Sequence, residues 1–557
     1  DGTWRERALL EAEDGTVQDG FGAALAANGD RLVVGAPGAN TVYVFRSQQS
    51  SGWTQTAQLS PADSTEDFGT SLAVTDDRIF VGSAATVTTT NADTTTGGAV
   101  HVFRSQTSET WREARTLRGD DVPADAAFGR TLAASGNHLL VGAPEWDGGA
   151  VVSFRHGSDG WTERQTLRAA TLGQNAQFGA ALEQAGDQVL VGAPRALDAT
   201  GAVVPYSRTE SDTAWTQTGR LLPLTAGDRS FFGTALAADG SDLWVGAPGP
   251  VRMIFMYQNR AQKHWPWGRA PSNDGGALYR FQREDDTWAQ SERIAHPGTE
   301  AGDGLGATLA AGESMVAAGL PGDDYGAGTM ALYAPDGGWT SDTPIAPTQG
   351  ASFSALTGEE RACSDGSVNA FSCQKVDLKS FLPTKSIGGP RGTHITDIWG
   401  WQDPETGTEY ALVGRTDGIA FVNVSDPTNP VYVGELPQTE KARINSWGDV
   451  KVYENHAFAV ADNAGDHGMQ VFDLTRLRTV APDEQPVTFD ADALYDRVNS
   501  VHNIFVNEET GYAYLVGSSG GGTTCGGGLH MVNVKNPLNP TFEGCFTDPS
   551  TGRSGTG

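Results

Sequence analysis

The side chains best suited to chemistry gather in the last third of the chain. Half of its ten histidines lie there: His394, His456, His467, His502 and His530. When the strands expected in this region are aligned by their starts, Asp397, Asp449 and Asn503 take equivalent positions. His394 and His502 lie close to two of these positions along the chain. Carboxylate, amide and imidazole groups bind calcium and transition metals, so the set predicts a site for a divalent cation.

An acidic loop is a second candidate for metal binding. Asp462 and Asp466 belong to the sequence Asp-Asn-Ala-Gly-Asp-His, which ends at His467. The loop lacks the bidentate glutamate of a calcium-binding loop. Both candidates have a structural alternative, because Asp and Asn also cap turns where strands begin and hydrogen-bond the next segment.

The elements that would hold such a site are short strands, and residues 1–345 show their pattern most clearly. A motif of Phe-Gly, then Gly-Ala-Pro, then an aromatic strand and a Trp recurs about every 50 residues. Its copies begin at Phe21, Phe68, Phe128, Phe178 and Phe232, with a degenerate copy at Leu305; the copy at Phe68 has Val81-Gly82 in place of the full Gly-Ala-Pro motif. Each copy holds four short apolar runs separated by turn residues, the pattern of a four-stranded propeller blade. We predict an all-β propeller of six blades, with seven as the alternative, closed by a strand at Trp4.

These motifs resemble the FG-GAP repeats that form the propeller of integrin α chains, over about residues 1–345. The resemblance implies a propeller of the kind used in adhesion. Calcium-binding members carry an Asp-x-Asp-x-Asp-Gly loop between the two motifs, whereas this chain has short turns such as Asn28-Gly29-Asp30. One acidic side chain cannot supply the roughly six to eight oxygens of a calcium site. We therefore expect no calcium in this half, and expect the Phe and Gly residues to serve packing and tight turns.

A different repeat follows an expected linker at 346–362, which contains Pro, Gly and Ser. Residues 363–557 hold apolar runs such as 410–414 and 418–424, the latter followed by Ser-Asp-Pro-Thr-Asn-Pro. These runs resemble LVIVD repeats, and the region is similar to the choice-of-anchor B family of secreted bacterial proteins. The resemblance implies a second, tandem β-propeller. Three blades would leave open strand edges, so we expect this propeller to be incomplete, with further blades and a C-terminal anchor beyond Gly557.

The composition is strongly acidic. The chain has 68 Asp and Glu residues against 38 Lys and Arg residues, a formal net charge of −30, which argues against nucleic acids and anionic membranes as partners. Only seven of the basic residues are lysines. Such a surface suits a protein in concentrated salt, where charges are screened, and a GC-rich genome that favours Arg codons is the alternative. No apolar run reaches the ~18 residues of a membrane span.

Four cysteines fall into two local pairs, Cys363 with Cys373 and Cys525 with Cys545. An even number of closely spaced cysteines in a loop-rich β protein predicts disulfides and an exporting compartment. We therefore expect an extracellular or cell-surface protein of a bacterium, from a saline habitat.

One segment departs from the acidic pattern. Residues 251–273 contain no acidic residue, and their basic and aromatic side chains are Arg252, Arg260, Lys263, Trp265, Trp267 and Arg269, among others. Such an insertion is suited to docking on an acidic, carbohydrate or neighbouring-subunit surface. The alternative is a sequence error such as a local frameshift, because the flanking motifs belong to one interrupted blade.

Taken together, these features predict an exported, surface-associated protein that binds or scaffolds other proteins or glycans, without catalysis in this chain. Propellers carry their functions in sites grafted onto loops, so fold alone does not identify the ligand. The first alternative is a hydrolase or oxidase that uses a divalent cation, calcium or a transition metal, in the second module. The second alternative is a subunit of an extracellular oligomer, in which another chain completes the second module.

Overall fold

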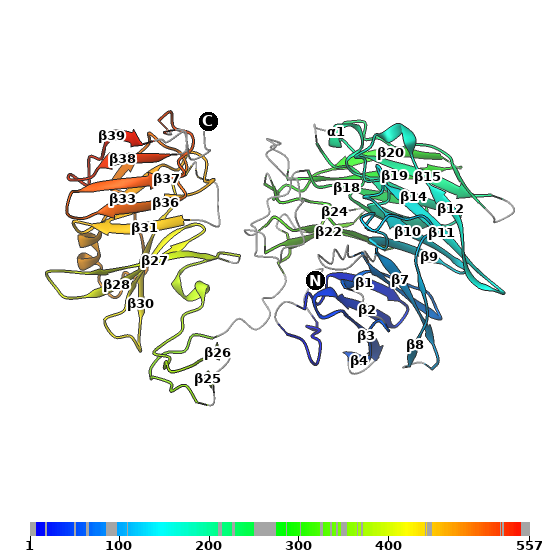
Figure 1. Ribbon diagram of the computed structural model, residues 1–557, viewed down its shortest axis with the longest axis horizontal. Helices are drawn as coiled ribbons and strands as arrows, with labels where there is room; N and C mark the ends of the chain where they lie inside the picture. The colour runs from blue at the N-terminus through cyan, green and yellow to red at the C-terminus, as the bar shows by residue number, and fades with distance from the viewer. Residues whose placement is uncertain are drawn as a thin grey trace. The chain divides into compact units, whose positions relative to one another are not determined.

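A computed structural model describes most of the chain. The described residues are 7–16, 19–48, 52–62, 66–84, 97–107, 110–209, 214–225, 229–249, 275–285, 287–300, 302–312, 314–323, 327–334, 337–340, 344–346, 354–364, 366–368, 371–390, 392–440, 442, 448–523, 525 and 528–546. They divide into two compact units, one up to residue 346 and one from residue 354 on (Figure 1). The predicted strand at Trp4 and the basic insertion at 251–273 lie outside the described residues.

The first three sheets of the first unit are antiparallel and four-stranded, with strands in chain order. The first sheet comprises β1 (Ala24–Asn28), β2 (Arg31–Ala36), β3 (Thr41–Gln48) and β4 (Gly52–Leu59). The second comprises β5 (Phe68–Val74), β6 (Arg78–Ser83), β7 (Ala99–Ser105) and β8 (Trp111–Leu117). The third comprises β9 (Thr131–Ser135), β10 (His138–Ala143), β11 (Ala150–Gly157) and β12 (Gly160–Leu167).

Three further sheets of the same kind complete the described part of this unit. The fourth comprises β13 (Ala181–Ala185), β14 (Gln188–Ala193), β15 (Ala202–Arg208) and β16 (Trp215–Gln217). The fifth comprises β17 (Ala235–Asp239), β18 (Asp242–Ala247), β19 (Ala277–Glu284) and β20 (Thr287–Ile294). The sixth comprises β21 (Leu309–Gly312), β22 (Met315–Leu320), β23 (Thr329–Ala334) and β24 (Gly338–Trp339).

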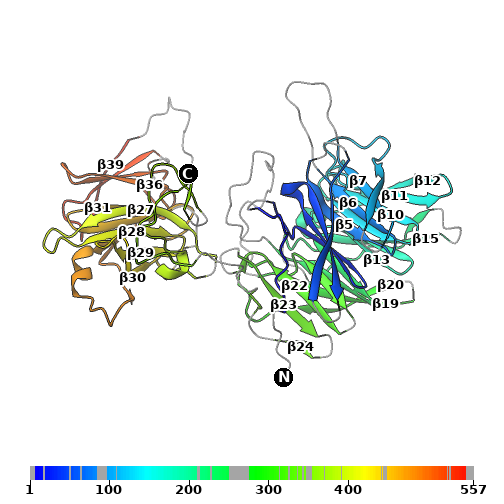
Figure 2. The same ribbon diagram turned by 90° about the horizontal axis from the view of Figure 1, so that it is seen from below.

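The first strands of these sheets, β1, β5, β9, β13, β17 and β21, lie side by side in that order, as blades of a propeller do. Figure 2 shows sheets of this unit, among them those of β5 to β7, β10 to β12 and β22 to β24, in a second view. The all-β prediction is confirmed. The described residues hold one four-stranded sheet for each copy of the sequence motif. Closure of the ring was predicted to use Trp4, outside the described residues, so the blade count stays a prediction.

The Phe of the Phe-Gly motif is a core residue. Phe68, Phe128, Phe178 and Phe232 are at most 1% exposed. Each lies next to an aromatic ring on the third strand of its own sheet, for example Phe178 against Tyr206 with ring centroids 6.1 Å apart. The same Phe also belongs to a core shared with the preceding sheet, because Phe178 packs with Leu140 and Val151. These residues bury the apolar faces between neighbouring sheets, as the sequence predicts.

The glycines of the Phe-Gly and Gly-Ala-Pro motifs allow the backbones of neighbouring sheets to approach each other closely. In the third sheet, the N–H of Gly129 donates to the carbonyl oxygen of Gly142 at 3.0 Å. The Cα of Gly142 faces the next sheet, where a Cβ would overlap the carbonyl oxygen of Gly179. Gly179 itself has a φ of 92°, a conformation that favours glycine. The same glycine-to-carbonyl approach joins Gly35 to Gly69, Gly82 to Gly129, Gly192 to Gly233 and Gly246 to Gly306.

The outer strands add a second link between sheets. In three of the sheets, the residue two positions after the motif Trp is Glu or Gln, and its side chain accepts a hydrogen bond from the backbone of the connection that precedes its sheet. The pairs are Ala62 N–H to Glu113 at 2.8 Å, Asp120 N–H to Glu163 at 2.7 Å and Leu224 N–H to Gln290 at 2.9 Å.

The described residues of the second unit form three larger sheets and a hairpin. The hairpin comprises β25 (Ser367–Val368) and β26 (Phe371–Ser372). The first sheet comprises β27 (Ile395–Gln402), β28 (Glu409–Arg415), β29 (Gly418–Asn423), β30 (Val431–Pro437) and, parallel to β30, β34 (Val487–Thr488). The second comprises β31 (Gly448–Tyr453), β32 (His456–Ala461), β33 (Met469–Asp473) and β35 (Ala493–Tyr495), and the third β36 (Asn503–Asn507), β37 (Tyr512–Val516), β38 (Leu529–Asn533) and β39 (Thr541–Phe546).

Aromatic residues fill the space between the first two of these sheets. Phe421 and Phe472 stack with ring centroids 4.8 Å apart, and Phe489 contacts both. Part of the predicted linker also belongs to this unit, since Leu356 pairs with Phe381. The described helices are short: η1 (Pro37–Ala39), η2 (Ala170–Leu172), α1 (Ala196–Ala199), η3 (Thr384–Ile387) and η4 (Leu474–Thr479). None of them is long and apolar enough to cross a membrane.

Candidate functional site

The three equivalent residues of the second unit lie on neighbouring first strands. Asp397 on β27 accepts a hydrogen bond from the N–H of Val450 on β31 at 3.1 Å. Asp449 on β31 accepts one from the N–H of Ile504 on β36 at 2.8 Å. Asn503 Nδ2 lies 3.3 Å from Asp449 Oδ2. Each carboxylate therefore links its own sheet to the next. This is the contact expected if these residues serve the structure, by hydrogen-bonding the next segment, and not a metal ion.

Lys451 supplies a positive charge to this cluster. Its ammonium contacts the Asp449 carboxylate and lies 3.4 Å from Asp397 Oδ2. It also donates to the carbonyl oxygen of Val450 at 3.0 Å and lies 4.4 Å from the centre of the Trp399 ring. A divalent cation at this place would have to share both carboxylates with the ammonium.

The pKa values of the Asp397 and Asp449 carboxyl groups shift in opposite directions. Burial and the hydrogen bond with Asp397 raise the pKa of Asp449. For Asp397, burial is outweighed by the hydrogen bonds from Asp449 and from backbone N–H groups, so its pKa is lowered. Two carboxyl groups in contact rarely ionise together, and the pair is suited to sharing one proton.

The remaining predicted ligands lie in other contacts. His502 Nδ1 is 2.8 Å from Asp462 Oδ2. This contact connects the predicted strand-start site, to which His502 belongs, with the predicted acidic loop, to which Asp462 belongs. Asp466 accepts a hydrogen bond from the Asn499 side chain, and the N–H of His394 donates to Thr416 Oγ1 at 3.3 Å. Within the described ranges, three or more His, Cys, Asp or Glu side chains never converge as a metal site would require. The divalent cation therefore stays a prediction.

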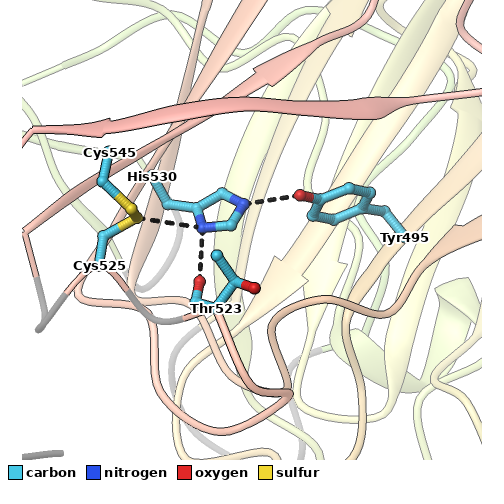
Figure 3. The surroundings of a disulfide bond; sticks show 5 residues. All are labelled: Tyr495, Thr523, Cys525, His530 and Cys545. Atoms are coloured by element: carbon cyan, nitrogen blue, oxygen red, sulfur yellow. Dashed lines mark hydrogen bonds between the residues drawn. A yellow bond between two sulfur atoms is a disulfide. The ribbon is translucent and has the colours of Figure 1, made fainter.

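Both predicted disulfides are confirmed, Cys363–Cys373 and Cys525–Cys545. The second lies beside His530, which is fully buried on β38 (Figure 3). His530 Nδ1 is 2.7 Å from the carbonyl oxygen of Thr523, so Nδ1 carries the proton, and Nε2 accepts from the Tyr495 hydroxyl at 2.7 Å. Burial lowers the pKa of His530. Burial therefore favours the neutral imidazole, which joins the disulfide loop to the second sheet.

A half-buried glutamate of the first unit was missed by the sequence interpretation. Glu183 on β13 stands where other first strands have alanine, for example Ala133 and Ala237. Its Oε1 accepts a hydrogen bond from the N–H of Ala238 on the next sheet at 3.1 Å. Burial raises the pKa of Glu183 to about 7, although this hydrogen bond favours the ionised form. When the first strands are aligned, Glu183 is the residue that differs at a position otherwise occupied by alanine, and this difference was the signal available in the sequence.

This pKa predicts a stabilising substitution. A raised pKa contributes stability that is present below the ordinary pKa of 4.5 and is lost as the pH rises through about 7. Glu183→Gln keeps the acceptor for Ala238 and removes the charge. We expect the variant to match the wild type near pH 4 and to be more stable by about 2 kcal/mol at pH 8. Urea unfolding at both pH values measures the difference, and a variant less stable at pH 8 would contradict the assignment.

A pocket of about 380 Å³ lies on the loops around the fourth sheet. Its walls come from the connection before β13, from the turn between β14 and β15, and from the connection before β17. Because neighbouring strands are antiparallel, all three segments lie at the same end of the sheet. The residues that line it include Gln174, Asn175, Arg195, Asp198, Arg229 and Phe231.

Arg195 and Arg229 were also missed. Arg195 directly follows Gly-Ala-Pro, where the other clear copies of the motif have Gly38, Glu145 and Gly249. Burial and the charge of Arg229 lower the pKa of Arg195, and Glu145 opposes this effect more weakly. The change of residue after a repeated motif could have drawn attention to Arg195. By contrast, the predicted docking residues Arg252, Arg260, Lys263, Trp265, Trp267 and Arg269 lie outside the described residues.

Comparison with known sequences supports the propeller assignment for the start of the chain. The sequence profile described as "FG-GAP repeat" matches residues 4–50. Curated proteins gave no match. The FG-GAP match and the described sheets together support a β-propeller, whereas the LVIVD and choice-of-anchor B resemblance has no counterpart among these findings.

Several solved structures resemble parts of the chain at low identity. A functionally unknown protein from Desulfotomaculum acetoxidans is 12% identical, with 57% of this chain and 82% of that chain covered and a TM-score of 0.37. A periplasmic gluconolactonase from Pseudomonas aeruginosa is 15% identical, with 59% and 84% covered and a TM-score of 0.36. Hydrazine synthase from Kuenenia stuttgartiensis is 11% identical, with 59% and 81% covered and a TM-score of 0.38. Likenesses of this size say nothing about function.

Proposed function

We propose that this chain is an exported protein that binds or scaffolds proteins or glycans at a bacterial surface. The observation that carries the proposal is the 380 Å³ pocket, which three loops build on the rigid sheets of the first unit. Binding sites are commonly formed by loops on such a scaffold. The two disulfides and the FG-GAP match are consistent with an extracellular location. We assign the second unit to the LVIVD-repeat, choice-of-anchor B type as part of the same proposal.

The proposal is tested with labelled chain on an array of polysaccharides and extracellular proteins. We expect saturable binding that survives a chelator and survives the double substitution Asp397→Asn/Asp449→Asn. The ligand should be recovered chemically unchanged. Absence of binding to both classes, or recovery of cleaved or oxidised ligand, would contradict the proposal.

A metal-dependent hydrolase or oxidase is the second candidate. It is favoured by the contact between Asp397 and Asp449, because carboxyl pairs with shifted pKa values are frequent at active sites. The metal content of the purified protein tests this candidate. It is measured by elemental mass spectrometry for the wild type and for the variants Asp397→Asn, Asp449→Asn and His502→Ala. Bound metal that depends on these residues supports the enzyme, and a metal content that the substitutions leave unchanged contradicts it.

Assembly with another chain is the third candidate. Phe505 on β36 and Phe546 on β39 are 61% and 63% exposed, and exposed rings of this size favour protein contacts. Light scattering over a range of concentrations tests this candidate, since monomers at every concentration would contradict self-association.

A further inference from the structure

The two cysteines of the Cys525–Cys545 disulfide differ in their access to solvent. Cys525 is 8% exposed, whereas Cys545 is exposed on β39. β39 is an edge strand of its sheet, and among the described residues it pairs with β38 alone. A disulfide is cleaved when a thiolate attacks one of its two sulfur atoms. Cys545 is therefore the cysteine at which a thiolate from solvent can attack.

A hydrogen-bond donor lies beside the buried sulfur. His530 Nδ1 is 3.5 Å from Cys525 Sγ (Figure 3). The carbonyl oxygen of Thr523 fixes the proton on this nitrogen, and the Tyr495 hydroxyl occupies Nε2 on the other side of the ring. The N–H is thus shared between the carbonyl oxygen and the sulfur. His530 is fully buried on β38, opposite Cys545 in the strand register, so its N–H is shielded from water.

This donor favours cleavage of the disulfide. The sulfur of an intact disulfide is a weak hydrogen-bond acceptor, whereas hydrogen bonds to an ionised group such as a thiolate are roughly twice as strong as neutral ones. The contact between His530 and Cys525 therefore strengthens as the bond between the two sulfur atoms breaks. An interaction that strengthens during a step accelerates that step, and a stabilised thiolate is the better leaving group.

The other disulfide has a different environment. Among the residues that the structure describes, no side chain donates a hydrogen bond to either sulfur of the Cys363–Cys373 bond. The N–H of Cys363 donates to Asp377 Oδ1 at 2.9 Å, which places a carboxylate beside that cysteine. A like charge nearby disfavours a thiolate. The Cys363–Cys373 bond is therefore a reference, within the same chain, for the reactivity of Cys525–Cys545.

We propose that Cys525–Cys545 is a site of thiol–disulfide exchange, which an external dithiol reduces by attack on Cys545 while His530 stabilises the departing Cys525 thiolate. In the first step, one thiolate of the dithiol bonds to Cys545 Sγ, and the electron pair of the broken bond leaves with Cys525 Sγ. In the second step, the other thiolate of the dithiol attacks the dithiol sulfur of this mixed disulfide and releases Cys545. The dithiol is oxidised to a disulfide, and the protein gains two electrons and two protons as a pair of thiols. The inference is independent of the binding function proposed above.

The test is reduction of the whole folded chain by dithiothreitol at pH 8. Samples are alkylated at intervals, and mass spectrometry of the digested chain gives the rate at which each cysteine becomes free. We expect Cys525 and Cys545 to become free together, in proportion to the dithiothreitol concentration and at least about fivefold faster than Cys363 and Cys373. A smaller ratio would overturn the proposal. A rate that does not rise with dithiothreitol would also overturn it, because the bond would then be reached only when the unit unfolds.

Substitutions around His530 separate its role from the stability of the fold. His530→Phe removes the donor and should slow the reduction of Cys525–Cys545 about tenfold, whereas a loosened fold by itself would speed the reduction. His530→Asn keeps a side-chain N–H and should have a rate between those of His530→Phe and the wild type. Tyr495→Phe is the matched control, because it removes the hydrogen bond on the far side of the ring and leaves the Nδ1 donor in place. It should be reduced at the wild-type rate.

Two results with these variants would overturn the proposal. A rate in His530→Phe that is not lowered would show that the imidazole does not stabilise the departing thiolate. An equal loss of rate in Tyr495→Phe would assign the effect to packing of the ring and not to its N–H. If His530→Phe does not fold, His530→Asn and the comparison of the two disulfides in the wild type still decide.

Discussion

Gly142→Ala is expected to lower the free energy of unfolding of the first unit by about 3 kcal/mol. Gly142 lies on β10 with an ordinary φ, so the cost comes from space alone. A Cβ at this position would overlap the carbonyl oxygen of Gly179 on the next sheet and Thr131 Oγ1 within its own sheet. The backbone of one of the two sheets must move to admit the methyl group. Equilibrium unfolding in guanidinium chloride measures the effect.

Gly157→Ala is the matched control for this prediction. Gly157 ends β11 of the same sheet, and a Cβ there would have no neighbour within 4 Å. We expect its free energy of unfolding to change by less than about 0.5 kcal/mol. Hydrogen exchange of the Gly179 N–H, which donates to Gly192 at 3.0 Å, should accelerate only in Gly142→Ala. Equal stability of the two variants would show that the sheets do not meet through these glycines.

Lys451→Met is expected to destabilise the second unit by about 3 kcal/mol at pH 8, because it leaves two carboxyl groups in contact without their cation. Lys451 lowers the pKa of both Asp397 and Asp449, so its removal raises both. A group with a raised pKa gives stability that is present below its ordinary pKa and is lost as the pH rises. The deficit of the variant should therefore grow from about pH 4, near the ordinary Asp value, and level off above the new pKa of Asp449.

Urea unfolding at several pH values from 4 to 8 measures this dependence. Lys535→Met is the control, since Lys535 is exposed after β38 and lies 4.9 Å from the centre of the Tyr512 ring, away from the Asp pair. Its stability should follow the wild type at each pH. A deficit in Lys451→Met that is the same at pH 4 and pH 8 would mean that lost packing, not charge, is responsible.

The sheets of the first unit could be predicted because each strand repeats the same local signals. Phe178-Gly179, Gly192-Ala193-Pro194 and Trp215 mark one sheet, and the structure has four strands between 181 and 217. The contact between Gly142 and Gly179 could not be predicted in this way, since a sequence period gives the order of sheets but not which atoms of neighbouring sheets touch.

The candidate sites, like the sheets, could be predicted from the sequence only in part. The alignment of strand starts correctly made Asp397 and Asp449 equivalent, because each contacts the backbone of the following sheet in the same manner. Lys451 was overlooked although it stands two residues after Asp449, on the same face of its strand. The pocket was not foreseen, because Arg195 and Arg229 are 34 positions apart and only the packing of consecutive sheets brings them together.

The glycine contact between sheets also bears on how such a chain can change in length. The five described junctions use the same two positions, the glycine of Gly-Ala-Pro (Gly82 in the second sheet) on one sheet and the carbonyl of the Phe-Gly glycine (Gly306 of Leu-Gly in the sixth) on the next. A duplication or deletion of one whole repeat, in phase with these motifs, would join surfaces that already fit. A gene of this kind can therefore gain or lose repeats by unequal recombination without a new interface having to evolve.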